Sequence, residues 1–203
     1  MHRALLSRFA AVCVAAVLSL GALSLARADD TQRNEFYRSL GSGSAVASTS
    51  DGPTALLVSG VIGPGSYEEF RLALMRGAPE LVVIDGPGGV LGEALLIGEE
   101  VRRRQLNTMV AARRSCASAC AIVFLSGRNK YVGPGAAIGL HSASTADGRS
   151  DPEATELMAK YLSGVGVPGS TLRRMARTAP NDIRWLTKAE QKALRITVLS
   201  DAR

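Results

Sequence analysis

From Ala55 onward, short apolar runs alternate with longer amphipathic segments, and this alternation constrains the fold more than any other feature of the sequence. The apolar runs predict strands at 55–59, 81–84, 108–112 and 137–140. The intervening and following segments predict helices at 66–77, 91–104, 118–125, 152–162, 171–177 and 188–194. Strands and helices that alternate at this spacing imply right-handed crossovers and a mostly parallel sheet. The sequence therefore predicts an α/β fold, and the 46% hydrophobic content of its 203 residues is enough to bury a core.

Two of the predicted helices begin with a capping-box pattern, in which a serine or threonine precedes a glutamate by one helical turn. Ser66 and Glu69 form the first pattern, and Thr187 and Glu190 form the second. In such a box each side chain satisfies a backbone amide that the first turn of a helix leaves free. We therefore expect helices to start at these two points.

The first 28 residues have the layout of a secretory signal peptide. The start is cationic, with Arg3 and Arg8, and an apolar run follows at 9–25. Ala26-Arg27-Ala28 then provides a small-x-small cleavage site. We expect cleavage after Ala28 and a periplasmic or secreted protein. An uncleaved helix that anchors the chain in a membrane is the alternative, although the apolar run is at the short limit for a membrane span.

The segment after the leader is predicted to be a flexible tether. Residues 41–44 and 48–53 are rich in glycine and serine, with one proline, and cannot build a core. This divides the chain into a signal peptide at 1–28, a tether at 29–53 and one domain at 54–203.

Composition argues against nucleic-acid binding. The net charge is +6, but three of the basic residues lie in the predicted leader, and aromatic residues make up only 4% of the chain. A surface that stacks on bases needs aromatic side chains among its basic ones, and the clusters at 102–104, 113–114 and 173–174 contain none. We therefore expect solvated basic faces and no nucleic-acid partner.

Few metal-ligating side chains remain once the leader is removed. Cys13 and His2 belong to the leader, which leaves Cys116, Cys120 and His141. Three soft ligands in an oxidising compartment do not favour a metal site. We expect neither a metal nor another cofactor, and any imidazole chemistry must use His141.

Three segments lie where a parallel sheet places its ligands, beyond the carboxyl ends of strands. Gly86-Pro87-Gly88-Gly89 follows one strand, Ser118 starts a predicted helix, and His141 follows the strand at 137–140. Each has a plain explanation: a tight turn, an N-cap serine or a structural histidine. The functional explanation is a serine nucleophile with a histidine base. The oxyanion that develops on the attacked carbonyl would meet free amides at the helix N-terminus.

Together these segments resemble the Clp protease proteolytic subunit, within the Clp/crotonase superfamily, over about 55–201. The order and spacing of the segments carry the resemblance, since no single motif is specific. The matching stretches are Ile84-Asp85-Gly86-Pro87-Gly88-Gly89, Ala117-Ser118-Ala119-Cys120-Ala121-Ile122-Val123-Phe124-Leu125, Gly139-Leu140-His141 and Arg184-Trp185-Leu186-Thr187. The resemblance implies the spiral fold of that superfamily, with a mostly parallel sheet and flanking helices.

The resemblance also implies acyl transfer by a serine peptidase. Ser118 would be the nucleophile, His141 the base and Asp182 the third triad member, with the amides of Gly89 and Ala119 as the oxyanion hole. Asp182 is displaced by one residue, because Ile183 stands where the family has its aspartate. A non-catalytic binding module with an incomplete triad is therefore the alternative function.

The predicted export limits which partners are expected. No ATPase that unfolds substrates is expected outside the cytoplasm, so the substrates would be short peptides or unfolded segments. The stretch from His141 to Asp182 is shorter than the family's handle segment, so the resemblance does not carry over the family's stacked double ring and leaves self-association into a homo-oligomer open. A crotonase-type acyl-CoA enzyme is a minor alternative, since coenzyme A is not expected there.

The two cysteines flank Ser118 and allow further interpretations. A disulfide between Cys116 and Cys120 would brace the nucleophile turn, and otherwise both would be small buried residues. A cysteine nucleophile paired with His141 is a minor alternative. A serine–lysine pair like that of signal peptide peptidase A is another, with Lys130 as the lysine.

Overall fold

The computed structural model describes residues 43–47 and 55–200, and the predicted leader and most of the predicted tether lie outside this part. The described strands are β1 (Gly43–Ala47), β2 (Ala55–Ile62), β3 (Leu81–Gly89), β4 (Asn107–Val110), β5 (Ser115–Ala117), β6 (Lys130–Val132), β7 (Ala137–Leu140), β8 (Arg184–Trp185) and β9 (Ile196–Val198). The described helices are α2 (Ser66–Arg76), α3 (Leu91–Arg103), α4 (Ala119–Leu125), α5 (Pro152–Gly164), α6 (Gly169–Arg177) and α7 (Lys188–Ala193).

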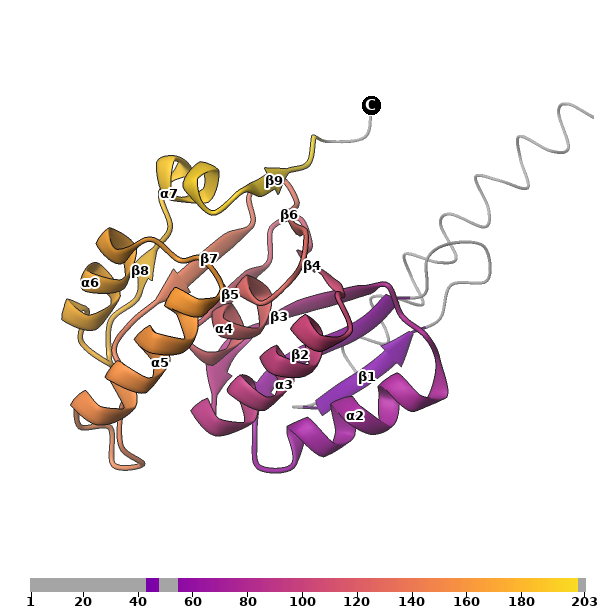
Figure 1. Ribbon diagram of the computed structural model, residues 1–203, viewed down its shortest axis with the longest axis horizontal. Helices are drawn as coiled ribbons and strands as arrows, with labels where there is room; N and C mark the ends of the chain where they lie inside the picture. The colour runs from indigo at the N-terminus through magenta and orange to yellow at the C-terminus, as the bar shows by residue number, and fades with distance from the viewer. Residues whose placement is uncertain (1–42, 48–54, 201–203) are drawn as a thin grey trace, which may run out of the picture. The chain divides into compact units, whose positions relative to one another are not determined.

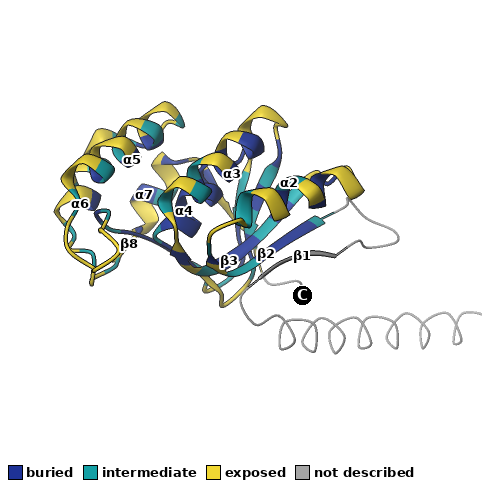
Figure 2. Cartoon of the chain, turned by 90° about the horizontal axis from the view of Figure 1, so that it is seen from below, coloured by how far each residue is buried: buried dark blue, intermediate teal, exposed yellow. Residues whose placement is uncertain are grey.

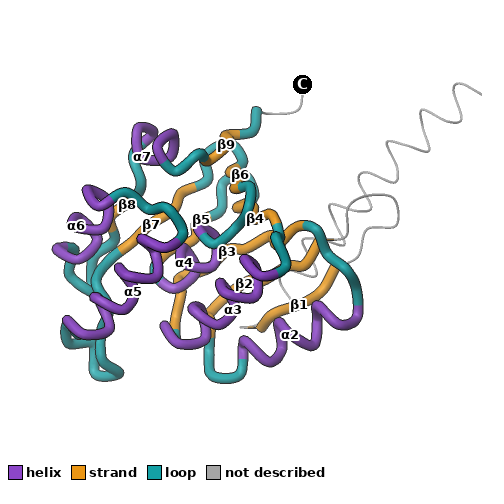
Figure 3. The backbone as a smooth tube through the Cα atoms, viewed as in Figure 1, coloured by secondary structure: helices purple, strands orange, loops and turns teal. Residues whose placement is uncertain are grey.

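These strands form one sheet in the order β8-β7-β5-β3-β4-β6-β9, with β2 also paired to β3 and β1 to β2 (Figure 3). The pairs that follow the strand–helix alternation are parallel, whereas β1–β2 and β7–β8 are antiparallel. The predicted mostly parallel α/β sheet is confirmed. β1 lies within the predicted tether: residues 43–47 form a strand there that pairs with β2.

β3 is the strand on which the sheet divides. Its first residues, beginning at Leu81, pair with β4, and further along Gly86 pairs with Cys116 of β5. The apolar run that predicted a strand at 81–84 continues as part of β3 through the glycines to Gly89, although Gly86, Gly88 and Gly89 have positive φ. The glycine segment and β5 are consequently brought side by side.

The core lies between this sheet and the helices, as the burial colouring of Figure 2 shows. Helices α2 and α3 cover the same face of β2 and β3 (Figures 1 and 2). Every residue of α4 is buried, which explains why its sequence is apolar without a polar face. Ser118 directly precedes this enclosed helix.

Local details differ from the sequence-based expectations in two places. The Thr187 capping box is present in full. The box predicted at Ser66 is wrong: Gly65 is the N-cap residue, and the Ser66 hydroxyl accepts a hydrogen bond from the Gly63 amide at 2.9 Å. The short strands β5, β6, β8 and β9 were not predicted, since two or three residues carry too little periodicity and depend on pairing with neighbours.

Within 43–47 and 55–200, no helix has the length and apolarity needed to cross a membrane.

Candidate active site

A cleft of about 460 Å³ opens where the carboxyl ends of β2, β3, β5 and β7 meet. Its lining includes Gly89, Ser118, Ala119 and His141. Ile62, Leu91, Ile122 and Met158 make part of the wall apolar, and the loop 142–146 closes one side. The structure thus brings together four of the five residues predicted for the catalytic and oxyanion roles.

Ser118 occupies the sharp turn between β5 and α4. Its backbone has φ 56° and ψ −126°, a conformation that costs a non-glycine residue about 1–3 kcal/mol and persists only where the surroundings impose it. The Ser118 amide donates to the Gly139 carbonyl at 2.9 Å, and its own carbonyl accepts from the Ala121 amide at 3.0 Å. Among the described residues the Ser118 side chain forms no capping hydrogen bond, so the N-cap explanation does not account for this serine.

The glycine segment of β3 packs directly against this turn. Gly88 has φ +100°, and a Cβ at that position would lie 2.7 Å from both the Ser118 Cβ and the Ala119 nitrogen. Gly89 has φ +143°, and a Cβ there would overlap the Ile62 carbonyl. Only glycine permits this approach, because any side chain would meet backbone atoms.

The N-terminus of α4 supplies donors for a developing anion. Ala119 is the first residue of the helix, so its amide has no acceptor within the helix. The helix dipole also favours negative charge at this end. The Gly89 and Ala119 amides in one cleft are therefore suited to an oxyanion hole.

His141 follows β7, and its ring is held by a local hydrogen bond. The ring atom Nδ1 lies 2.6 Å from the Ser142 carbonyl oxygen. Because a carbonyl oxygen can only accept, Nδ1 carries the proton and Nε2 is left as the acceptor in the neutral ring. The Ser142 backbone is itself fixed by its amide, which donates to the Thr178 carbonyl at 2.9 Å.

Asp182 is not brought to this cleft. Its carboxylate is exposed and accepts from the Ile183 amide at 2.8 Å, and no ion pair joins it to His141 in the described structure. The neighbouring side chain of Ile183 instead contacts β7 at Gly139. On the Nδ1 side of His141, where a triad carboxylate would bind, the structure has the Ser142 carbonyl. The role of Asp182 as the third triad member stays a prediction.

Of the two alternatives for Cys116 and Cys120, the structure has the disulfide. Their Cα atoms are 5.2 Å apart, and both side chains are buried. Ser118 lies midway between them in the sequence. Because both sulfurs are bonded, neither is a free thiol, so the structure does not favour a cysteine nucleophile.

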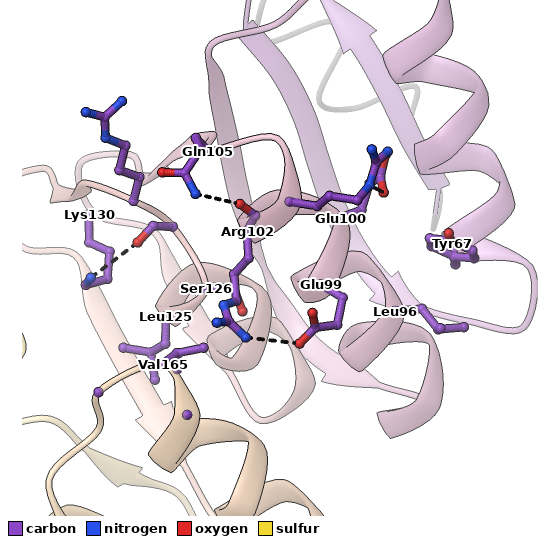
Figure 4. Close-up of a pocket in the computed structure, with 15 residues that line it drawn as sticks. Tyr67, Leu96, Glu99, Glu100, Arg102, Gln105, Leu125, Ser126, Lys130 and Val165 are labelled. Carbon is purple, nitrogen blue, oxygen red and sulfur yellow. Dashed lines mark hydrogen bonds and ion pairs between the residues drawn. The ribbon is translucent and has the colours of Figure 1, made fainter.

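Lys130 lies in β6 and lines a different, larger cavity of about 850 Å³ (Figure 4). Its Nζ donates to the Gly127 carbonyl at 3.3 Å. Burial lowers the pKa of Lys130, and the charge of Arg195 adds to this effect. Lys130 is not among the residues that line the Ser118 cleft, and this separation argues against a serine–lysine pair.

One buried ionic group was missed by the sequence analysis. Asp85, 8% exposed, accepts from the Ser59 hydroxyl at 2.6 Å and forms an ion pair with Arg114. The pair lies directly before the contact between Gly86 and Cys116, so it joins the two strands that lead to Gly89 and Ser118. An acidic residue that directly follows an apolar strand was the available signal.

Within 43–47 and 55–200, no group of three or more histidine, cysteine or acidic side chains is placed to hold a metal ion.

Comparison with protein-family models finds no match, and none is found among curated protein sequences. Among solved structures, a mutant of the membrane-bound stomatin-specific protease 1510-N superposes with a TM-score of 0.54 at 18% identity, covering 73% of this chain and 78% of that one. A second mutant of that protease, in complex with a substrate peptide, gives 0.55 at 20% identity, covering 73% and 74%. The ClpP protease catalytic domain from Plasmodium falciparum gives 0.55 at 16% identity, covering 72% and 86%.

The chain has a ClpP-like fold. ClpP1 from Listeria monocytogenes supports the same conclusion, with a TM-score of 0.54 at 16% identity over 72% of this chain and 92% of that one. In this ClpP-like fold the cleft lies at the carboxyl ends of the central strands, where α/β sheets place their ligands. The fold alone does not assign chemistry, which has to be argued from the cleft.

Proposed function

We propose that the protein is an exported serine hydrolase that acts as a peptidase on short or unfolded peptides. One observation carries the proposal: Ser118, on a strained turn with no capping bond from its hydroxyl in the described structure, shares a cleft with His141, Gly89 and Ala119. The neighbouring folds, one of them bound to a substrate peptide, support a peptide as the substrate.

The reaction follows from the roles of these groups. The Ser118 hydroxyl attacks the peptide carbonyl carbon, and its proton passes to Nε2 of His141. The carbonyl oxygen becomes an oxyanion that accepts from the Gly89 and Ala119 amides. The C–N bond then breaks as His141 returns the proton to the leaving amine, which leaves an acyl-enzyme. Water, deprotonated by His141, releases the acid and restores the serine.

In this cleft the Ser142 carbonyl fixes the tautomer of His141, which is the orienting task that a triad aspartate performs in related sites. A carbonyl carries no full charge, so it stabilises the imidazolium less than a carboxylate does. We therefore propose a serine–histidine pair that reacts more slowly than a complete triad.

The location and partners are part of the same proposal. The leader at 1–28 supports a periplasmic or secreted protein cleaved after Ala28. Without an ATPase partner, the cleft would take peptides that are already unfolded. Self-association into a homo-oligomer is compatible with this activity and is not required by it.

Labelling with a fluorophosphonate tests the proposal. The Ser118 oxygen would attack phosphorus and fluoride would leave, which adds one phosphonyl group per chain. We expect one adduct by intact mass on the wild type, none on Ser118→Ala, and labelling at least about 100-fold slower on His141→Ala.

Two control variants sharpen this test. Ser144→Ala changes another serine that lines the same cleft, and Lys130→Met removes the alternative base. Both should label at the wild-type rate. An adduct that persists on Ser118→Ala, or one that is lost on Lys130→Met, would refute the assigned roles.

A second function, a non-catalytic peptide-binding module, is favoured by the Asp182 carboxylate, which bonds to the Ile183 amide and forms no ion pair with His141 in the described structure. Under this alternative the folded wild type gives no adduct. It would still bind unfolded peptides, and a bulky substitution of a cleft residue such as Ala143→Trp would weaken that binding.

A further inference from the structure

The Cys116–Cys120 disulfide encloses the candidate nucleophile. Cys116 is the central residue of β5 and Cys120 is the second residue of α4. The bond therefore closes a small loop whose middle residue is Ser118. Both cysteines are almost fully buried, with exposed fractions of 0% and 1%.

The strand that leads into this turn is short. β5 has only three residues, and it meets β3 at one pair, Gly86 with Cys116. The peptide groups of Ser118 are held by two backbone hydrogen bonds, one to Gly139 and one from Ala121. A non-glycine residue at φ 56° relaxes unless its surroundings prevent it.

The disulfide supplies a constraint of the required kind. Its two ends are anchored in different elements: Cys116 pairs with Ile138 of β7, and Cys120 is fixed in the fully buried α4. Rotation of Ser118 toward an ordinary φ would change the separation of these ends, and the bond between the sulfurs opposes that change.

We propose that the Cys116–Cys120 disulfide positions Ser118, so that the serine reactivity of this chain depends on the bond being formed. The inference rests on the proposed hydrolase function. The cysteines are positioning residues, because neither sulfur takes part in the reaction at the peptide carbonyl.

The redox step involves a dithiol reductant and two exchanges. A thiolate of the dithiol attacks one sulfur of the bond and forms a mixed disulfide; its second thiolate then displaces the protein sulfur, which leaves two cysteine thiols and an oxidised dithiol. Because both protein sulfurs are buried, the exchange requires local opening. The reduced chain therefore reacts slowly, and it becomes fully reactive when a small-molecule disulfide takes up the two electrons by the reverse exchange and is released as two thiols. The folded, oxidised chain then resists reduction.

The test compares fluorophosphonate labelling rates of the purified full chain at a temperature well below every unfolding midpoint. The samples are the oxidised wild type, Cys116→Ala, Cys120→Ala and the double variant. We expect each variant to label about 100-fold more slowly, the loss associated with a misplacement of about 1 Å. The three losses should be equal, because each variant removes the same bond, whereas independent packing effects would add.

A control separates positioning from general loss of stability. Leu74→Ala opens a cavity under the last turns of α2, so it lowers the unfolding temperature without touching the Ser118 turn. It should label at the wild-type rate. Amide hydrogen exchange adds a readout independent of activity: peptides covering 115–125 should exchange faster in the cysteine variants and unchanged in Leu74→Ala.

The outcomes distinguish this inference from the proposed function. An adduct on the cysteine variants at a rate within about threefold of the wild type, with unchanged exchange at 115–125, overturns the positioning role and leaves the hydrolase intact. Absence of an adduct on the folded, oxidised wild type overturns both.

Discussion

The two cavities that contain the candidate bases, Lys130 and His141, differ in kind as well as in size. The larger, about 850 Å³, is lined mainly by charged and polar side chains at the end of α3 and beyond α4, whereas the Ser118 cleft measures about 460 Å³. In the larger cavity Arg102 pairs with Glu99 (Figure 4), and Arg103 pairs with Glu100. Those charges are already used in local ion pairs. Cavity volume therefore does not identify the reactive site. The Ser118 hydroxyl, which makes no capping hydrogen bond in the described structure, is a better indicator.

The cavities also differ in what builds them. The Ser118 cleft depends on backbone in unusual conformations, at Gly88, Gly89 and Ser118. The larger cavity is lined by side chains of α3 and β6 and by the loops that follow α3, α4 and α5. Substitutions that alter backbone should therefore affect reactivity at the cleft, and substitutions that alter charge should affect stability at the larger cavity.

The largest effect is expected for Gly89→Ala. Its Cβ would overlap the Ile62 carbonyl, at φ +143°, so the Gly89 amide must move from the oxyanion hole. Loss of one such donor slows the reaction by about 100- to 1,000-fold, which fluorophosphonate labelling measures. Gly92→Ala is the matched control, since a Cβ there meets nothing and should leave the rate unchanged. Equal rates for the two variants would remove Gly89 from the site.

A smaller effect is expected for Asp85→Asn. The change removes the negative charge of the buried side chain that pairs with Arg114 and loosens the strands that carry Gly89 and Ser118. We expect labelling about tenfold slower and a free energy of unfolding lower by about 2 kcal/mol, less than a fully buried pair because Arg114 is half exposed. Urea unfolding checks the second value. Glu68→Gln, which breaks an exposed pair with Arg71, should change neither quantity measurably.

At the larger cavity, Glu100→Gln should change stability without changing labelling. The hydrogen bond from Arg103 is the main cause that lowers the pKa of Glu100 below its ordinary 4.5. A depressed carboxyl pKa stabilises the folded state above pH 4.5 and loses this contribution as the pH falls through the folded value. We expect a loss of about 1 kcal/mol at neutral pH.

The pH dependence makes this prediction specific. The difference between wild type and Glu100→Gln should disappear in strong acid, as measured by unfolding at several pH values. Glu99→Gln, on an exposed pair, is the matched control and should be nearly neutral throughout. A difference that grows in acid would contradict a lowered pKa of Glu100 in the folded state.

The smallest effect is expected for Asp182→Asn. Because the carboxylate bonds to the Ile183 amide and forms no ion pair with His141 in the described structure, labelling should stay within about threefold of the wild type. A loss of about 10,000-fold, typical of a triad aspartate made neutral, would show that Asp182 reaches His141 during reaction.

The sequence predicted most of the architecture, because helices and buried strands leave periodic patterns. The runs at 81–84 and 137–140 and the Thr187 box appear where expected, and the helix predicted at 118–125 begins one residue later, at Ala119. For the cysteine pair, spacing and compartment allowed a disulfide and left two small buried residues as the alternative, and the structure has the disulfide. Short strands such as β8 were not, since two residues carry no period and exist only through pairing with β7.

The candidate site likewise combines features that the sequence predicted with features that depend on tertiary contacts. The sequence by itself determined that a glycine segment, a serine at a helix start and one histidine follow buried strands, and a parallel sheet gathers such positions at one edge. Only the tertiary structure decided that the Gly88 backbone meets the Ser118 turn and that Ile183, in place of Asp182, contacts β7. The physical reason is pairing over a long sequence separation: β8 pairs with β7, which places Ile183, directly before β8, against Gly139, whereas Asp182 lies in the bend that precedes it.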